Sequence, residues 1–236
     1  MEIPGLRDSQ NKGEREMLRE LDLNAVSDGK RYRQSDMVKA GCNDCKGCSD
    51  CCRGMGDSIV LDPFDVYQLC SHLGQNFETL LSYALELRMA DGLILPNLKM
   101  TLEEEQCPFL NAQGRCSIHA FRPGFCRMFP LGRIYEENGF HYFLQIHECR
   151  QNPKTKVKIS KWLGIPRIQE YERFVLHWHT FLKKAEKIAA QFHEESAVKN
   201  VCIFVLKTFY LTPYKAESDF YEQFEGRLKK AEIYFF

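Results

Sequence analysis

The feature that most constrains this chain is a run of cysteines between residues 41 and 54, in the stretch GCNDCKGCSDCCRG. Five of its fourteen residues are cysteine; four follow one another at three-residue intervals, and the fifth directly follows the fourth. The whole chain holds 11 cysteines, so a scheme of disulfides alone would leave at least one thiol over. Such density indicates either disulfides in an oxidising compartment or bound metal in a reducing one.

Two properties of the chain favour the reducing compartment. The N-terminus is polar and lacks the apolar segment of a signal peptide, and the longest apolar run, VCIFVL, is too short to span a membrane. Lys plus Arg number 32, as do Asp plus Glu, so the net charge of zero gives no reason to expect nucleic acid or an anionic membrane as a partner. We therefore expect a cytoplasmic, metal-binding protein, and a protein partner stays open.

Nine of the cysteines have the spacing or position of metal ligands. A CxxC spacing lets two thiolates turn toward one centre, and thiolates are soft ligands that favour zinc and iron–sulfur clusters. The candidate metal ligands are Cys42, Cys45, Cys48, Cys51, Cys52, Cys107, Cys116, Cys126 and Cys149. His147 is an alternative ligand or a hydrogen-bond donor to one. Cys70 and Cys202 lie inside helical patterns and are expected to be buried thiols without a metal.

The number and kind of metal centres follow less directly from the spacing. Neighbouring side chains of an extended chain point in opposite directions, so Cys51 and Cys52 suit two separate centres. A CxxCxxC run with a distant fourth ligand resembles the pattern of [4Fe–4S] clusters, whereas structural zinc usually takes two CxxC knuckles per ion. We therefore predict one or two iron–sulfur clusters, with zinc as the alternative. Arginines close to the cysteines could balance the thiolate charge: Arg53, Arg115, Arg122, Arg127 and Arg150.

The predicted fold is α+β, with a small cysteine-rich, metal-bound core of short strands and a β-hairpin, followed by a helical C-terminal part. We expect an N-terminal arm over 1–40, a cysteine-cluster metal-binding domain over 41–160, and a helical region over 161–236 that packs on it. Asp62 and Pro63 suit the N-cap and first turn of a helix.

Further elements follow from apolar periodicity and turn residues. A second helix is predicted from Phe77 to Met89. Asn138-Gly139 is a type I′ turn signal within a hairpin over 132–149. Short strands are expected at 92–96 and 99–103, and helices at 14–21, 166–192, 197–210 and 216–233.

The cysteine pattern resembles a known family. CKGCSDCC fits the CxxCxxCC signature of the YkgJ-like cysteine-cluster proteins, and CPFL followed by GRCSIHAFRPGFCRMFPLG is similar to the second half of that family's pattern. The resemblance covers roughly 42–150 and implies a zinc- or iron-chelating domain, with Cys149 as the late cysteine. It also implies a relation to flagellin lysine N-methylases.

Three functions are consistent with these patterns. The first is an iron–sulfur protein with a redox or accessory role. The second is a structural zinc module that presents helices to a protein partner. The third, which depends on the resemblance alone, is a protein-modifying enzyme like the lysine methylases. The sequence shows no clear catalytic motif, and RGMGDS lacks the spacing of a nucleotide-binding glycine loop.

Overall fold

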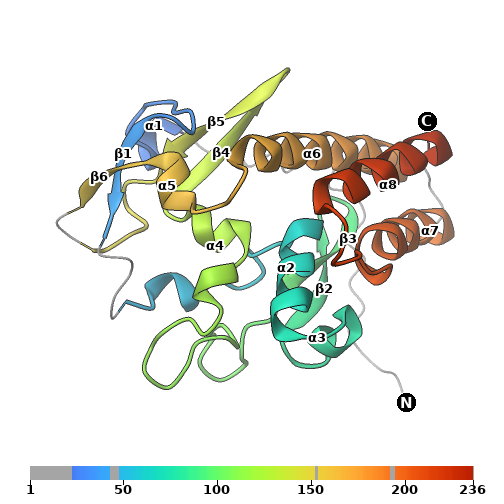
Figure 1. The fold of residues 1–236 in the computed structure, drawn as a ribbon, viewed down its shortest axis with the longest axis horizontal. Helices are drawn as coiled ribbons and strands as arrows, with labels where there is room; N and C mark the ends of the chain where they lie inside the picture. Colours follow the sequence, from blue (N-terminus) through green and yellow to red (C-terminus); the bar gives the residue numbers. More distant parts are fainter. Residues whose placement is uncertain (1–22, 43–47, 152–153, 192–194, 236) are drawn as a thin grey trace, which may run out of the picture.

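The computed structural model describes residues 23–42, 48–151, 154–191 and 195–235, and within them the fold is α+β. Figure 1 shows small antiparallel strand pairs in the first two thirds of the chain and long helices at its end. The strands are β1 (Met37–Gly41), β2 (Leu85–Ala90), β3 (Leu93–Leu98), β4 (Leu131–Glu136), β5 (Gly139–Leu144) and β6 (Thr155–Lys158). The α-helices are α1 (Leu23–Val26), α2 (Pro63–Leu73), α3 (Phe77–Tyr83), α4 (Gly124–Met128), α5 (Ile159–Leu163), α6 (Ile168–Gln191), α7 (Glu195–Leu206) and α8 (Phe220–Phe235).

The strands form three separate two-stranded antiparallel sheets rather than one continuous sheet. β2 pairs with β3 and β4 pairs with β5, each as a hairpin. β1 pairs with β6, which comes more than 100 residues later, through partners such as Val38 and Val157. This long-range pair brings the residues after β1 close to the residues before β6, where several cysteines lie.

Helix α2 begins as the sequence predicts. The Asp62 carboxylate accepts a hydrogen bond from the Asp65 amide at 2.8 Å, and the Asp65 carboxylate accepts one from the Asp62 amide at 3.2 Å. This reciprocal capping box satisfies two amides that the helix itself cannot. Pro63 occupies the first turn, and Gly74 ends the helix with a φ of 64°.

The C-terminal helices form an aromatic core with α6 at its centre. The α6 residues Phe174 and Trp178 contact Phe224 of α8 with edge-to-face rings, and Phe181 contacts Phe209. One continuous set of buried side chains extends from these helices to β1, β3 and α5. Among the described residues, no helix combines the length and apolar character that crossing a membrane requires.

The prediction of a helix from Phe77 to Met89 is wrong in its second half. Helix α3 ends at Tyr83, and β2 starts two residues later. The residues of β2 pair one to one with β3 across the turn Asp91-Gly92, whose φ angles of 48° and 78° suit a type I′ turn. The pairing satisfies the backbone of both strands, and this tertiary interaction overrides a short helical pattern.

Other sequence predictions had mixed outcomes. The predicted strand at 92–96 is confirmed as β3, and the three C-terminal helices are confirmed with shifted ends. The predicted strand at 99–103 is wrong, because these residues form turns in which the Thr101 amide donates to the Gln106 carbonyl at 2.9 Å. The predicted helix at 14–21 lies outside the described residues.

The predicted hairpin is confirmed as β4 and β5, but its turn was placed one residue too late. Glu136 pairs with Gly139, so the two turn residues are Glu137 and Asn138. Neither Asn138 nor Gly139 has the positive φ of a type I′ turn.

The capping box of α2 predicts a pH-dependent stability. Burial raises the pKa of Asp62 to about 6, and burial together with the neighbouring Asp62 charge raises the pKa of Asp65. The folded state then holds protons more tightly than the unfolded state. The resulting contribution to the free energy of unfolding is full below the unfolded pKa of about 4 and is lost as the pH rises through the folded-state pKa.

Asp62→Asn keeps a good N-cap acceptor but removes the titration. From about pH 4 to about pH 7, we expect the wild type to lose about 1–2 kcal/mol of unfolding free energy relative to this variant. Urea denaturation of both proteins at the two pH values measures this difference. A difference that stays constant with pH would contradict the prediction.

Candidate metal centre

Backbone pairing brings two distant cysteine segments together. Asp50–Cys52 forms a short 3-10 turn, in which the Cys52 amide donates to the Ser49 carbonyl at 2.8 Å. The Cys107 amide donates to the Cys52 carbonyl at 2.8 Å, and the Gly54 amide donates to the Glu105 carbonyl at the same distance. The cysteine-rich loop is thus joined side by side to the segment that carries the next predicted ligand.

The segment after Cys107 folds back on itself and carries Cys116 to the same region. Leu110 and Cys116 form an antiparallel bridge, and the Leu110 amide donates to the Cys107 carbonyl at 3.0 Å. The Asn111 side chain accepts hydrogen bonds from the Gln113 and Arg115 amides, which closes the turn between them. Cys107 and Cys116 therefore lie at the two ends of one compact loop.

Cys126 is positioned by helix α4, which Asp65 of α2 holds in place. The Gly124 amide, in the first turn of α4, donates to a carboxylate oxygen of the buried Asp65 at 2.7 Å. Sequence reasoning found Asp62 as the cap of α2 but missed this second bond. No local signal in the sequence points to this bond, because the partner glycine lies 59 residues away.

The C-terminal helix α6 also reaches α4. A Cβ atom at Gly124 would overlap with the Tyr171 hydroxyl of α6, so only glycine allows this approach. The Tyr171 hydroxyl accepts a hydrogen bond from the Arg133 guanidinium at 3.1 Å. Burial raises the pKa of Tyr171 well above its usual value, although the nearby Arg133 charge acts to lower it. The placement of Cys126 therefore depends on α2, β4 and α6 together.

Six of the predicted ligands line one cavity of about 50 Å³. They are Cys48, Cys51, Cys52, Cys107, Cys116 and Cys126. Apolar side chains, among them Ile118 and Trp162, form much of the remaining wall, and Trp162 is anchored by donating to the Phe129 carbonyl at 3.2 Å. In Figure 1 the 3-10 turn Asp50–Cys52 and helix α4, which carry three of these cysteines, lie away from α7 and α8.

Four thiols of this cavity, Cys51, Cys107, Cys116 and Cys126, have raised pKa values, to which neighbouring thiols contribute. A hydrogen bond with Cys52 and burial raise the pKa of Cys51. Burial raises the pKa of Cys107 to about 11, with smaller contributions from Cys116 and Cys51. Burial also raises the pKa of Cys126 well above its usual value. Thiolate sulfurs are soft metal ligands, and here several of them lie close together. Such a group suits a metal cation that compensates the thiolate charge.

Cys42, Cys48 and Cys149 form a second group. The pKa of Cys149 is raised by burial and then by the charges of Cys42 and Cys48. Cys42 directly follows β1, and Lys154, just before β6, donates to the Cys149 carbonyl at 2.7 Å. The β1–β6 pair therefore brings these cysteines together, and Cys48 also lines the first cavity.

The structure thus gathers eight of the nine predicted ligands into two neighbouring groups, while Cys45 lies outside the described residues. Within the part of the chain that is described, no three Cys, His, Asp or Glu side chains stand in an arrangement that would hold a metal ion. The donor chemistry of the cavity fits zinc or an iron–sulfur cluster, but the assignment of individual ligands stays a prediction.

The remaining sulfur and imidazole groups lie elsewhere. Cys202 is buried and its sulfur accepts a hydrogen bond from the Ile94 amide at 3.3 Å, while Cys70 is half-buried on α2. Neither lines the cavity. His147 is exposed, whereas His119, which we did not predict as a site residue, lies in the cavity wall.

Two of the five flanking arginines line the cavity, namely Arg115 and Arg122. The charge of Arg122 acts to lower the pKa values of Cys51 and Cys116, against the larger effects that raise them. Arg127 has a structural role instead, since it donates to the Arg122 carbonyl at 2.9 Å and to the Leu163 carbonyl at 3.3 Å.

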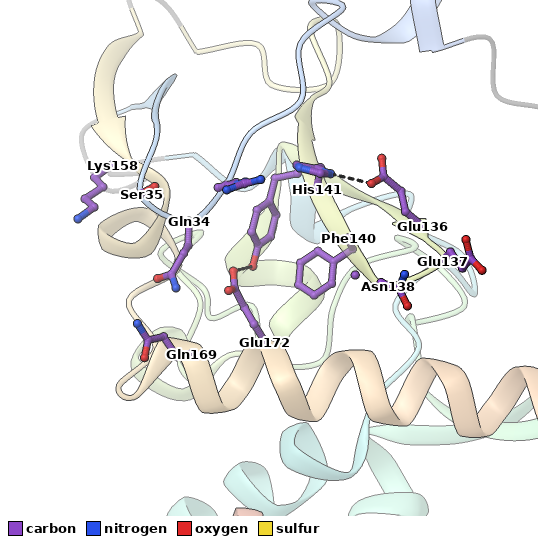
Figure 2. A pocket seen from close by; sticks show the side chains of 13 residues that line it. Gln34, Ser35, Glu136, Glu137, Asn138, Phe140, His141, Lys158, Gln169 and Glu172 are labelled. Carbon is purple, nitrogen blue, oxygen red and sulfur yellow. Dashed lines mark hydrogen bonds and ion pairs between the residues drawn. The ribbon is translucent and has the colours of Figure 1, made fainter.

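A second, larger hollow of about 750 Å³ lies at the tip of the β4–β5 hairpin, where no cysteine lines it. Figure 2 shows that charged and amide side chains surround it. Several of them already have partners, because Tyr142 donates to Glu172 at 3.0 Å and His141 lies 3.2 Å from Glu136. The two hollows share no lining residue, so this one is separate from the thiols.

The α+β fold and its thiol cavity define a cysteine-cluster protein. Residues 44–161 match the family model CxxCxxCC, described as "Putative zinc- or iron-chelating domain", and the chain belongs to this family. The matched range includes all the predicted ligands except Cys42. Metal binding is therefore supported, whereas the relation to flagellin lysine N-methylases stays a prediction.

No curated protein matches the chain, and no solved structure matches it either.

The close approach of Gly124 to Tyr171 predicts a specific sensitivity. Gly124→Ala should displace α4 or α6, lower the melting temperature by several degrees and reduce bound metal per chain. Gly226→Ala is the matched control, since a Cβ there meets open space on α8. Thermal melts with metal analysis of both variants test this. Equal behaviour of the two variants would show that the Gly124 contact does not hold Cys126.

Proposed function

We propose that this protein binds one or two iron–sulfur clusters of the [4Fe–4S] type and has a redox or accessory role. The observation that carries the proposal is the number of thiols around one cavity. Six cysteines line it, whereas a single structural zinc ion takes four ligands. With Cys42 and Cys149 beside Cys48, the eight cysteines are enough to provide the ligands of two tetrathiolate centres.

The arrangement along the chain supports iron–sulfur clusters over zinc. Several donors come from one run at three-residue intervals, and the others come from single cysteines far along the chain. This is the pattern of cubane clusters, in which a short loop provides most of the ligands. When bound, such a cluster accepts and donates single electrons.

The position of the thiols supports a redox role. Cys48, Cys51 and Cys52 are only half-buried, so a centre held by them would lie near the surface. A partner could then approach closely enough to exchange electrons. Arg115 and Arg122 in the cavity wall would partly balance the negative charge that four thiolates leave on a cluster.

Structural zinc is the second candidate, and the cavity volume favours it. The cavity is small, about 50 Å³, and a single ion needs less space between its four thiolates than an eight-atom cubane does.

Anaerobic purification followed by iron, sulfide and zinc analysis distinguishes the two candidates. We expect iron and sulfide in equal amounts, with absorption at about 400 nm from thiolate-to-iron charge transfer. A colourless protein with stoichiometric zinc would rule out the redox role.

Single serine variants test which thiols carry the metal. Cys107→Ser and Cys126→Ser should each lose most of the metal of one centre, because a closed four-thiolate site does not tolerate the loss of a ligand. Cys70→Ser is the control and should retain the full metal content. Equal metal content in all three variants would contradict the proposed ligand set.

A further inference from the structure

Strand β2 lies at the edge of its two-stranded sheet. Within the described residues it pairs only with β3, and the outer side of β3 is already occupied. There the Leu98 amide donates to the Ile59 carbonyl at 3.0 Å, and the Leu61 amide donates to the Pro96 carbonyl at 2.8 Å. Any additional strand could therefore join this sheet only along β2.

The alternation of an antiparallel ladder determines which backbone groups face outward. The Pro96 carbonyl and the Leu98 amide point away from β2 and bond to residues 61 and 59. Their partners Leu87 and Leu85 therefore direct their own amides and carbonyls away from β3. Met89 follows the same alternation. These three residues present a regular row of donors and acceptors, since the register with β3 is unbroken over six pairs.

The free edge lacks several of the devices that usually block strand pairing, and its two charges, Glu86 and Arg88, are of opposite sign. The β2 sequence LELRMA contains no proline and no lysine, and the strand has no bulge. Leu87 is 42% exposed and Met89 is 62% exposed. An unprotected edge with exposed apolar side chains is a site for pairing with another strand.

The charges of β2 indicate which strand can pair with this edge. Only the odd-numbered residues of β2 direct their backbone amides and carbonyls away from β3. A second, antiparallel copy of β2 can therefore pair with its two-fold axis at any one residue of the strand, from Leu85 to Met89. Pairing about Glu86 or Arg88 places two like charges opposite each other. Pairing about Leu87 instead places Glu86 of each copy opposite Arg88 of the other, and like charges in direct opposition are destabilising.

We infer that two copies of this chain pair through β2, antiparallel and centred on Leu87, to form a four-stranded sheet. In this register Leu87 faces Leu87 of the second copy and Leu85 faces Met89, so the outward backbone groups are satisfied in pairs. Glu86 and Arg88, which lie 3.0 Å apart within one chain, gain the opposite charges of the second copy. The contact is two-fold symmetric and closes after two subunits.

The oligomeric state of the purified, metal-loaded protein tests the inference. Sedimentation equilibrium should show a dimer that dissociates on dilution, as expected for a small interface. Leu87→Pro should be a monomer, because the Leu87 amide makes no bond to β3 and its loss leaves the hairpin intact. Leu102→Lys, at an exposed position outside β2, is the control and should stay dimeric. A monomeric wild type, or a dimeric Leu87→Pro, would overturn the inference.

Charge exchange tests the register and remains informative even if Leu87→Pro does not fold. Arg88→Glu should weaken the dimer by about tenfold or more, because it places Glu86 opposite a second carboxylate. The double variant Glu86→Arg with Arg88→Glu should restore the wild-type dissociation constant. If the double variant is as weak as the single one, the pairing is not centred on Leu87.

Discussion

The crowding of buried thiols is the constraint on which the rest of this structure depends. Burial disfavours the ionisation of Cys107, Cys116 and Cys126, and neighbouring thiols add to this effect. A hydrogen bond with Cys52, together with burial, does the same for Cys51. Several thiolates can exist side by side there only if a cation shares their electrons. A chain that brings so many cysteines together therefore needs both a scaffold that holds them and a metal that makes their proximity favourable.

The scaffold consists of contacts between distant segments rather than of one rigid element. The loop of Cys51 and Cys52 is held by backbone bonds to residues 105–107, and Cys126 by the bond from Gly124 to Asp65. Tyr171 packs against Gly124 from the C-terminal helices. These helices, α6 to α8, begin after the family match ends at residue 161, yet Tyr171 of α6 takes part in positioning a predicted ligand.

The sequence predicted those parts of the fold that have local causes. The capping residues Asp62 and Pro63 located α2, and the apolar periodicity of α6 located the longest helix, because caps and amphipathic faces act within a few residues. The residues of β2 were assigned to a helix because a short apolar pattern does not distinguish the two states, and the partner that decides is β3.

The candidate site shows the same division. The cysteine spacing identified the thiols, but the expectation that Cys51 and Cys52 serve separate centres is not met, because they lie on a 3-10 turn and line one cavity. The spacing also could not find Asp65 and Tyr171, whose roles depend on residues far away in the sequence. His119 likewise appears in the cavity wall only through the fold of its loop.

The long separation of these segments has a consequence for biosynthesis. Cys51 and Cys52 leave the ribosome before their partners Cys107 and Cys126, and Tyr171 follows later still. Since a nascent chain folds from its N-terminus as it emerges, the first thiols must wait without their partners until Cys126, 74 residues after Cys52, has been translated. The cell must keep them free of oxidants and of stray metal during that interval.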